Sequence, residues 1–172
     1  MLKINKKNIL NLDLKSLMRR ASLIRNSYWG KDITYSRKVF IPLTNMCRDT
    51  CGYCTFVKHP NSREANILTP KQVLNIIKLG EEKGCKEALL SLGEKPELRY
   101  QRAKQKLNDL GHNSMIDYLF ETCLLILKNS SLLPHINAGT LSDEEFKLLH
   151  PVSASMGMML ETISRRLNKI GG

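Results

Sequence analysis

Three cysteines, Cys47, Cys51 and Cys54, stand within eight positions in the pattern C-x3-C-x2-C. Cysteine thiolates are ligands for zinc and for iron–sulfur clusters. A structural zinc site needs four protein ligands, and His59, a little further along the chain, would complete a Cys3His set. An iron–sulfur cubane held by three thiolates keeps one iron open, which makes it a site for chemistry. The spacing therefore indicates metal or cluster chemistry, with both alternatives open.

Other polar segments follow apolar runs later in the chain. The segment "SLGEKPE" contains Gly93 and Glu94, "NAGT" contains Asn137, and "LET" contains Glu161. Each preceding apolar run is expected to be a strand, as is "KVFIPL" before the cysteines. In parallel βα proteins the loops that follow the strands meet at one edge of the sheet, where active sites lie. We therefore expect all four segments to lie at that edge.

The elements that must position these residues alternate between strand and helix. An amphipathic helix is predicted from the N-cap Asp13 to about Tyr28, before the alternation begins. Capping boxes at Thr69 to Gln72 and at Ser142 to Glu145 start two of the later helices. The predicted strands are 38–43, 87–93, 132–139 and 154–161, and the predicted helices are 69–84, 99–111, 114–128 and 143–150. This order predicts an α/β fold with a parallel sheet built of right-handed βα units.

The composition is that of a folded protein in a reducing compartment. The chain has 172 residues, of which 42% are hydrophobic and 25% charged. No run of about 18 apolar residues is present, so the sequence predicts neither a membrane helix nor a signal segment. Its five cysteines are an odd number, which favours a metal or redox site over a disulfide framework. We expect a cytoplasmic protein that does not bind a membrane.

The net charge of +11 raises the question of a nucleic-acid partner. The basic residues are scattered along the chain, and the basic segments "MRRASLIR" and "RYQRAKQK" are not interleaved with aromatic residues that would stack on bases. We therefore expect a solvated basic surface and no nucleic-acid partner.

The cysteine motif carries a family resemblance. With Tyr53 just before the third cysteine, "CRDTCGYC" resembles the signature of radical S-adenosylmethionine (radical SAM) enzymes. Within that superfamily, the segments "NMCRDTCGYCTF", "GEKPELRY", "LLPHINAGTL" and "SASMGMMLE" together resemble subunit 1 of the 7,8-didemethyl-8-hydroxy-5-deazariboflavin (FO) synthases. The resemblance runs from about residue 37 to the last residue. It implies a radical SAM lyase or synthase.

The resemblance also implies cofactors, substrate and partners. A reduced 4Fe-4S cluster would pass an electron to S-adenosylmethionine, and the resulting 5′-deoxyadenosyl radical would abstract a hydrogen atom from a small-molecule substrate. That substrate would be 5-amino-5-(4-hydroxybenzyl)-6-(D-ribitylimino)-5,6-dihydrouracil, which closes to FO with release of ammonia. A partner FO synthase subunit would supply the substrate from tyrosine and 5-amino-6-ribitylaminouracil. An electron donor would reduce the cluster.

Residue roles follow from the same resemblance. The three cysteines would be the cluster ligands. Gly93 and Glu94 stand at the place of the superfamily's Gly-Gly-Glu motif, with Leu92 where its first glycine usually stands, and Glu94 would bind the ammonium group of S-adenosylmethionine. Tyr53 would present its backbone to the adenine. Glu161 resembles the acid that binds the ribose, and Asn137 would contact cofactor or substrate. No catalytic residue is assigned.

The resembled family has a six-stranded partial (βα)6 barrel, whereas about four βα units are expected here. We therefore expect an N-terminal helical extension, residues 1–35, and a radical SAM core domain, residues 36–172, that is incomplete at its C-terminus. Such a chain would be the N-terminal part of a longer enzyme. Two alternatives remain: an inactive truncated fragment of that enzyme, and a zinc-binding module with a basic surface.

Overall fold

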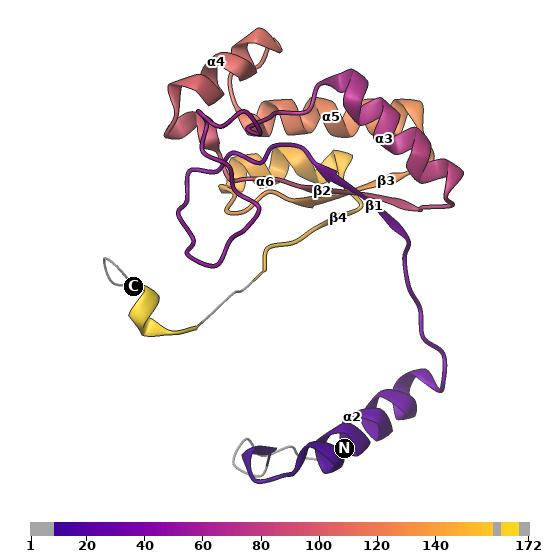
Figure 1. Cartoon of the computed structure of the whole chain (residues 1–172). Helices are drawn as coiled ribbons and strands as arrows, with labels where there is room; N and C mark the ends of the chain where they lie inside the picture. Colours follow the sequence, from indigo (N-terminus) through magenta and orange to yellow (C-terminus); the bar gives the residue numbers. More distant parts are fainter. Residues whose placement is uncertain (1–8, 160–162, 169–172) are drawn as a thin grey trace. The chain divides into compact units, whose positions relative to one another are not determined.

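The computed structural model describes residues 9–159 and 163–168. The chain forms two units, Met1–Tyr35 and Ser36–Gly172 (Figure 1). In the first unit, α2 (Leu14–Trp29) begins at Asp13, whose carboxylate accepts a hydrogen bond from the backbone N–H of Ser16 (3.0 Å). It ends at Gly30, which has a φ of 61°. The N-terminal helix is present as predicted, and none of its residues is buried.

The second unit is built on a parallel sheet. Within residues 36–159 the sheet has four strands in chain order: β1 (Lys38–Pro42), β2 (Glu87–Ser91), β3 (Leu133–Asn137) and β4 (Ser155–Met156). Each strand pairs in parallel with the next, which requires a crossover connection between them. The predicted α/β fold with a parallel sheet is confirmed.

Helices form these crossovers. They are α3 (Pro70–Glu82), η1 (Pro96–Leu98), α4 (Gln101–Asp109), α5 (Met115–Asn129), α6 (Asp143–Leu149) and η2 (His150–Val152), and η3 (Arg165–Asn168) follows β4. Both predicted capping boxes are present, at Thr69 with Gln72 and at Ser142 with Glu145. In the described part of the chain, no helix is both long enough and apolar enough to cross a membrane.

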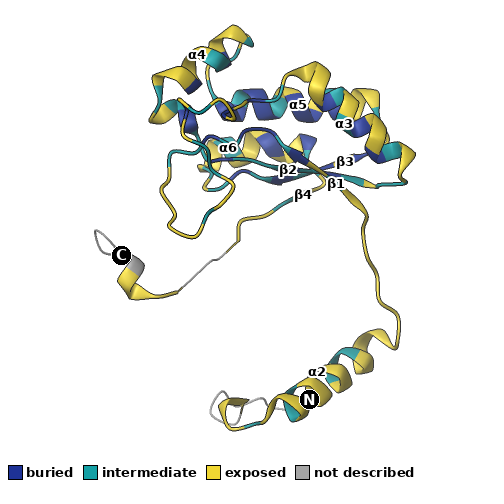
Figure 2. Cartoon of the chain, in the orientation of Figure 1, coloured by how far each residue is buried: buried dark blue, intermediate teal, exposed yellow. Residues whose placement is uncertain are grey.

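The core lies between one face of the sheet and the helices α3 and α5 (Figure 1, Figure 2). Strand residues alternate between the two faces, and those facing the helices, such as Ile41, Leu90 and Ile136, are at most 1% exposed. On the opposite face, Phe40 is 51% and Leu133 50% exposed. One face of the sheet is therefore closed by helices and the other is open.

The fourth strand is shorter than predicted. The sequence pattern predicts a strand over 154–161, but only Ser155–Met156 pairs with β3. Residues 157–159 are not in a strand, and residues 160–162 lie outside the described residues. The alternation of side chains predicts where this strand starts. Its length depends on how many residues pair with the backbone of β3, and the local sequence pattern does not contain that information.

Candidate functional site

The cysteines lie on the long segment between β1 and α3, residues 43–69, which we name the cysteine loop. The two ends of this loop are joined: the backbone N–H of Leu68 donates to the carbonyl of Leu43 (2.9 Å). The buried hydroxyl of Thr44 donates to the carbonyl of Asn66 (2.9 Å). The loop therefore starts and returns at the C-terminal end of β1, as expected for a site at that edge of the sheet.

The sulfur of Cys47 accepts hydrogen bonds from the backbone of its own loop and from that of the loop after β2. The donors are the N–H groups of Asp49 (3.4 Å) and Glu94 (3.2 Å). Cys54 closes a turn by donating its N–H to the carbonyl of Cys51 (3.1 Å). Cys51 is exposed, whereas Cys47 and Cys54 are half-buried. Two N–H groups therefore point at the Sγ of Cys47, one from its own loop and one from the loop after β2.

The groups around Cys51 oppose its ionisation. Burial and then the negative charges of Asp49, Cys47 and Cys54 raise the pKa of Cys51 above its ordinary value of 9.0. A bound cationic group removes this opposition, so thiolate formation and metal binding are coupled. Three thiols on one loop are the donor set that suits a cubane with one open iron. Among the described residues, no three His, Cys, Asp or Glu side chains form a group that would hold a single metal ion.

Gly93 brings the loop after β2 into direct contact with the cysteine loop. Its N–H donates to the carbonyl of Thr44 (2.9 Å), and the N–H of Arg48 donates to the carbonyl of Glu94 (2.9 Å). A Cβ added at Gly93 would lie 2.6 Å from the carbonyl carbon of Met46 and 3.0 Å from the Cβ of Cys47. The close approach of the two backbones therefore requires glycine at this position.

The carboxylate of Glu94 joins three loops. It forms an ion pair with Arg48 of the cysteine loop and accepts hydrogen bonds from the N–H (3.2 Å) and the hydroxyl of Thr140, in the loop after β3. Burial raises the pKa of Glu94, but the hydrogen bonds from Thr140 and the charge of Arg48 outweigh it and hold the pKa below 4.5. Glu94 is therefore an ionised acceptor beside Cys47.

Gly139 makes room for this carboxylate. It has a φ of 77°, in the left-handed region, and a Cβ there would lie 2.9 Å from the Cδ of Glu94. Sequence reasoning identified "NAGT" as a polar segment at the right edge of the sheet, but it assigned no role to Gly139 or Thr140. The glycine at the end of a predicted strand was the available signal.

The other predicted cofactor residues are less closely grouped. Tyr53 is 65% exposed in the cysteine loop. Asn137 ends β3, and its amide nitrogen donates to the carbonyls of Ile136 (3.0 Å) and Gly157 (3.1 Å) in the orientation that satisfies both ends of the amide. This contact links β3 to the segment after β4. Glu161 lies outside the described residues.

His59, the fourth ligand of the zinc alternative, contacts other groups. Its ring packs edge-on against Tyr100, with the ring centroids 5.7 Å apart, and its Nδ1 accepts a hydrogen bond from the N–H of Asn61 (3.3 Å). In the described part of the chain, it does not form with the cysteines a group suited to one metal ion.

Three side chains outside the cysteine loop bind its backbone carbonyls. Arg99 donates to the carbonyl of Arg48 (2.5 Å), Lys106 to that of Ala65 (2.8 Å), and the phenol of Tyr118 to that of Leu68 (2.5 Å). Sequence reasoning missed these supports, because a long polar side chain in a helical pattern does not show which distant carbonyl it will reach.

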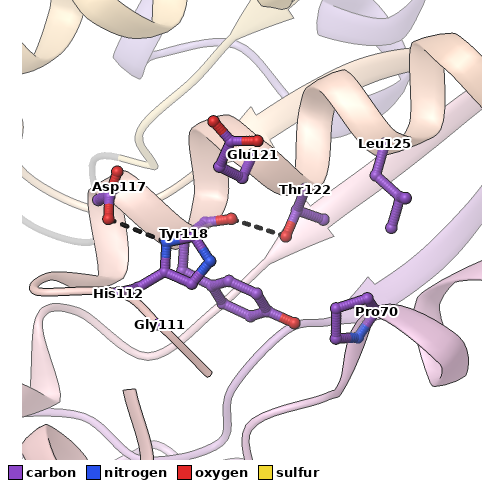
Figure 3. A pocket seen from close by; sticks show the side chains of 8 residues that line it. All are labelled: Pro70, Gly111, His112, Asp117, Tyr118, Glu121, Thr122 and Leu125. Carbon is purple, nitrogen blue, oxygen red and sulfur yellow. Dashed lines mark hydrogen bonds and ion pairs between the residues drawn. The ribbon is translucent and has the colours of Figure 1, made fainter. Parts of the chain in front are cut away.

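Tyr118 also lines a separate pocket of about 440 Å³ beside α5, shown in Figure 3. Within it, Nδ1 of His112 lies 2.9 Å from a carboxylate oxygen of Asp117. Burial raises the pKa of Tyr118 to about 12, so its phenol remains a hydrogen-bond donor. The lining residues are Pro70, Gly111, His112, Asp117, Tyr118, Glu121, Thr122 and Leu125. None belongs to the cysteine loop, and none is a predicted site residue.

Comparison with known proteins identifies similar chains. The family model of the Radical SAM superfamily matches residues 41–172. The FO synthase of Mycobacterium leprae is 48% identical over 144 residues, which are 81% of this chain and 17% of that protein. The 7,8-didemethyl-8-hydroxy-5-deazariboflavin synthase of Methanopyrus kandleri is 40% identical over 140 residues, 81% of this chain and 42% of that protein. The chain therefore spans less than half the length of either relative.

A solved structure supports the fold. HydG, a maturase of the FeFe-hydrogenase, superposes with a TM-score of 0.68 over 91% of this chain and 33% of that chain. The two sequences are 23% identical, so the likeness concerns the fold alone.

Proposed function

Because the chain belongs to the radical SAM superfamily, we propose that its cysteine loop holds a 4Fe-4S cluster and that its site takes part in the formation of FO. The superfamily in general implies such a cluster, S-adenosylmethionine and a small-molecule substrate. The observation that carries the deazaflavin proposal is the 48% and 40% identity to FO synthases over four-fifths of the chain. The contact between the cysteine loop and the loop after β2 supports it.

The cysteines Cys47, Cys51 and Cys54 would be the protein ligands. When bound and reduced, the cluster with S-adenosylmethionine supplies a 5′-deoxyadenosyl radical that abstracts a hydrogen atom from the substrate. The N–H groups of Asp49 and Glu94, at 3.4 and 3.2 Å from the Sγ of Cys47, would donate hydrogen bonds to a cluster-bound sulfur and so influence the reduction potential of the site.

Glu94 would receive the ammonium group of S-adenosylmethionine. A carboxylate has about four acceptor positions, and Arg48 and Thr140 use three of them. The remaining position suits one ammonium donor, while Arg48 and Thr140 hold the carboxylate in place. Tyr53 would offer its backbone to the adenine, Glu161 its carboxylate to the ribose, and Asn137 a contact at the end of β3.

The proposal extends to the partners of the reaction. FO formation here would use 5-amino-5-(4-hydroxybenzyl)-6-(D-ribitylimino)-5,6-dihydrouracil, supplied by a partner subunit, and an electron donor in the cytoplasm. The reaction would release ammonia.

The experiment is anaerobic reconstitution of the purified chain with iron and sulfide. We expect brown protein with broad visible absorption, a paramagnetic signal on reduction that changes when S-adenosylmethionine is added, and release of 5′-deoxyadenosine. With the partner subunit and a reductant present, we expect no FO from this chain alone, because it spans less than half the length of the FO synthases that it resembles. Tight uptake of zinc without any cluster absorption would contradict the proposal, and failure of the loaded chain to bind FO would contradict its deazaflavin part.

A matched pair of cysteine variants controls the assignment. Cys51→Ala removes one of only three proposed ligands and should abolish cluster retention. Cys85→Ala removes a half-buried thiol that packs against the core, and it should keep the cluster at a cost of about 1 to 2 kcal/mol in stability. Iron analysis compares the two proteins. A cluster retained by Cys51→Ala and lost by Cys85→Ala would refute the ligand assignment.

A further inference from the structure

A polar cluster lies on the open face of the sheet, away from the helices and from the cysteine loop. The strand register places Phe40, Leu89, His135 and Ser155 in one row across the four strands. Lys38 and Glu87 pair with each other one pleat nearer the N-terminal ends of β1 and β2. The face thus presents apolar surface from Phe40 and Leu89 beside a group of polar side chains.

His135 is the centre of the cluster. Its Nδ1 lies 2.7 Å from the hydroxyl of Ser155, 3.0 Å from Nζ of Lys38 and 3.2 Å from a carboxylate oxygen of Glu87. Lys38 and Glu87 form an ion pair of 2.8 Å. The hydrogen bond and charge of Lys38, with help from Ser36 and His135 and against the effect of burial, lower the pKa of Glu87 to about 2. The ion pair therefore remains charged at neutral pH.

The two nitrogens of His135 differ in their surroundings. Nδ1 faces both a donor, the ammonium group of Lys38, and an acceptor, the carboxylate of Glu87, so it is engaged within the cluster in either tautomer. Within residues 9–159 and 163–168, Nε2 has no hydrogen-bond partner, and the side chain is 21% exposed. His135 thus offers its second ring nitrogen, Nε2, in a fixed orientation to a ligand on the open face.

The position of His135 in β3 sets how long a ligand must be to extend from the C-terminal edge of the sheet to this side chain. His135 precedes Asn137 by two residues on the same face of β3, which places it about 7 Å below the edge where the cysteine loop lies. This rise is close to the length of an extended five-carbon chain. A ligand whose reactive ring lies at that edge would bring a hydroxylated tail to His135 and Ser155, while Phe40 and Leu89 contact apolar parts.

We infer that His135 and Ser155, oriented by Lys38 and Glu87, bind the hydroxyl-rich chain of the substrate. The inference rests on the proposed function, because a deazariboflavin carries a ribityl chain on its ring system. Hydroxyl groups of the chain would exchange hydrogen bonds with Nε2 of His135 and with Ser155. The same arrangement would distinguish a ribityl substrate from a ring that lacks the chain, since hydroxyl groups replace the hydrogen bonds of water at these two side chains and a methyl group does not.

The test compares two fluorescent probes, FO and the same deazaflavin ring with a methyl group in place of the ribityl chain. Binding is measured on cluster-loaded protein with S-adenosylmethionine present. We expect the parent to prefer FO by about tenfold, the value of one or two hydrogen bonds. His135→Phe should abolish this preference by weakening FO binding alone. His150→Phe, at the end of α6, is the matched control and should keep it.

Ser155→Ala provides a second variant that leaves the sheet interior unchanged, and it should reduce the preference about threefold. A parent that binds both probes without preference, or a His135→Phe protein that retains the preference, overturns the inference, while cluster loading, cofactor cleavage and FO binding leave the proposed function standing. A parent that releases no 5′-deoxyadenosine or binds neither probe would contradict the proposed function itself.

Discussion

Gly93 sets how closely the loop after β2 approaches the cysteines. Its place at the end of a predicted strand, before an acid, and its resemblance to the superfamily's Gly-Gly-Glu motif marked it as a site residue from the sequence. The partners of Glu94 could not be predicted in the same way, because Arg48 and Thr140 each lie 46 residues away from it. Contacts between side chains so far apart in the sequence depend on the register in which the strands pair, and the type of a single residue does not predict that register.

Substitution of Gly93 tests this close approach. Gly93→Ala should destabilise the chain by about 3 kcal/mol and lower its cluster content, because the new methyl group meets the backbone of Met46. Gly52→Ala is the matched control, since a Cβ there has no atom within 4 Å. Chemical unfolding and iron analysis measure both effects. Equal stability of the two variants would show that the loops separate without cost.

Glu94 provides the second prediction at this scale. Glu94→Gln removes the charge that would pair with the cofactor's ammonium, so S-adenosylmethionine should bind about tenfold to a hundredfold more weakly at unchanged cluster content. Calorimetry of the loaded protein measures the affinity. Glu64→Gln, which removes the exposed partner of Lys58 in the same loop, should leave it unchanged. Equal affinity in all three proteins would remove Glu94 from the site.

Among the elements, those with local signals were predicted closely. The helix predicted over 69–84 is α3, Pro70–Glu82, because Thr69, Pro70 and Gln72 specify its start within one turn. The strand predicted over 154–161 was too long, because the length of β4 depends on how far its backbone pairs with β3. The apolar positions of α2 predicted a helix correctly, but periodicity does not identify what an apolar face contacts, and no residue of α2 is buried.

The ion pair across β1 and β2 leads to a prediction on pH. Glu87 has a pKa of about 2 in the folded chain and an ordinary value of 4.5. The unfolded chain therefore takes up this proton first, so the stabilisation is complete above pH 4.5 and is lost as the pH falls towards 2.

Unfolding of the cluster-free chain measures this effect. Between about pH 5 and pH 3 the parent should lose on the order of 1 to 2 kcal/mol more than Glu87→Gln, after allowance for solvent screening. In a Lys38→Met background most of the difference between Glu and Gln should disappear. A constant difference across the pH range would mean that the pair does not lower the pKa of Glu87.

At the scale of the whole molecule, the contacts that build the site come from the unit Ser36–Gly172. No hydrogen bond described above for the cysteine loop, Glu94 or His135 involves residues 9–35. A chain that begins at Ser36 should therefore keep its unfolding midpoint and its cluster content, as measured by denaturant titration and iron analysis. Loss of the cluster on removal of residues 1–35 would show that the first unit contributes to the site.

The bridge from Arg48 through Glu94 to Thr140 also has a consequence for biosynthesis. Thr140 leaves the ribosome about ninety residues after Cys47, so the cysteine loop is synthesised long before its last support exists. At 5 to 20 residues per second, this interval is roughly five to twenty seconds. During that time the three thiols have no completed fold around them and are open to oxygen. We therefore expect the proposed cluster to be retained best once the third βα unit has been translated, and the yield of loaded protein in a cell to depend on how well nascent thiols are kept reduced.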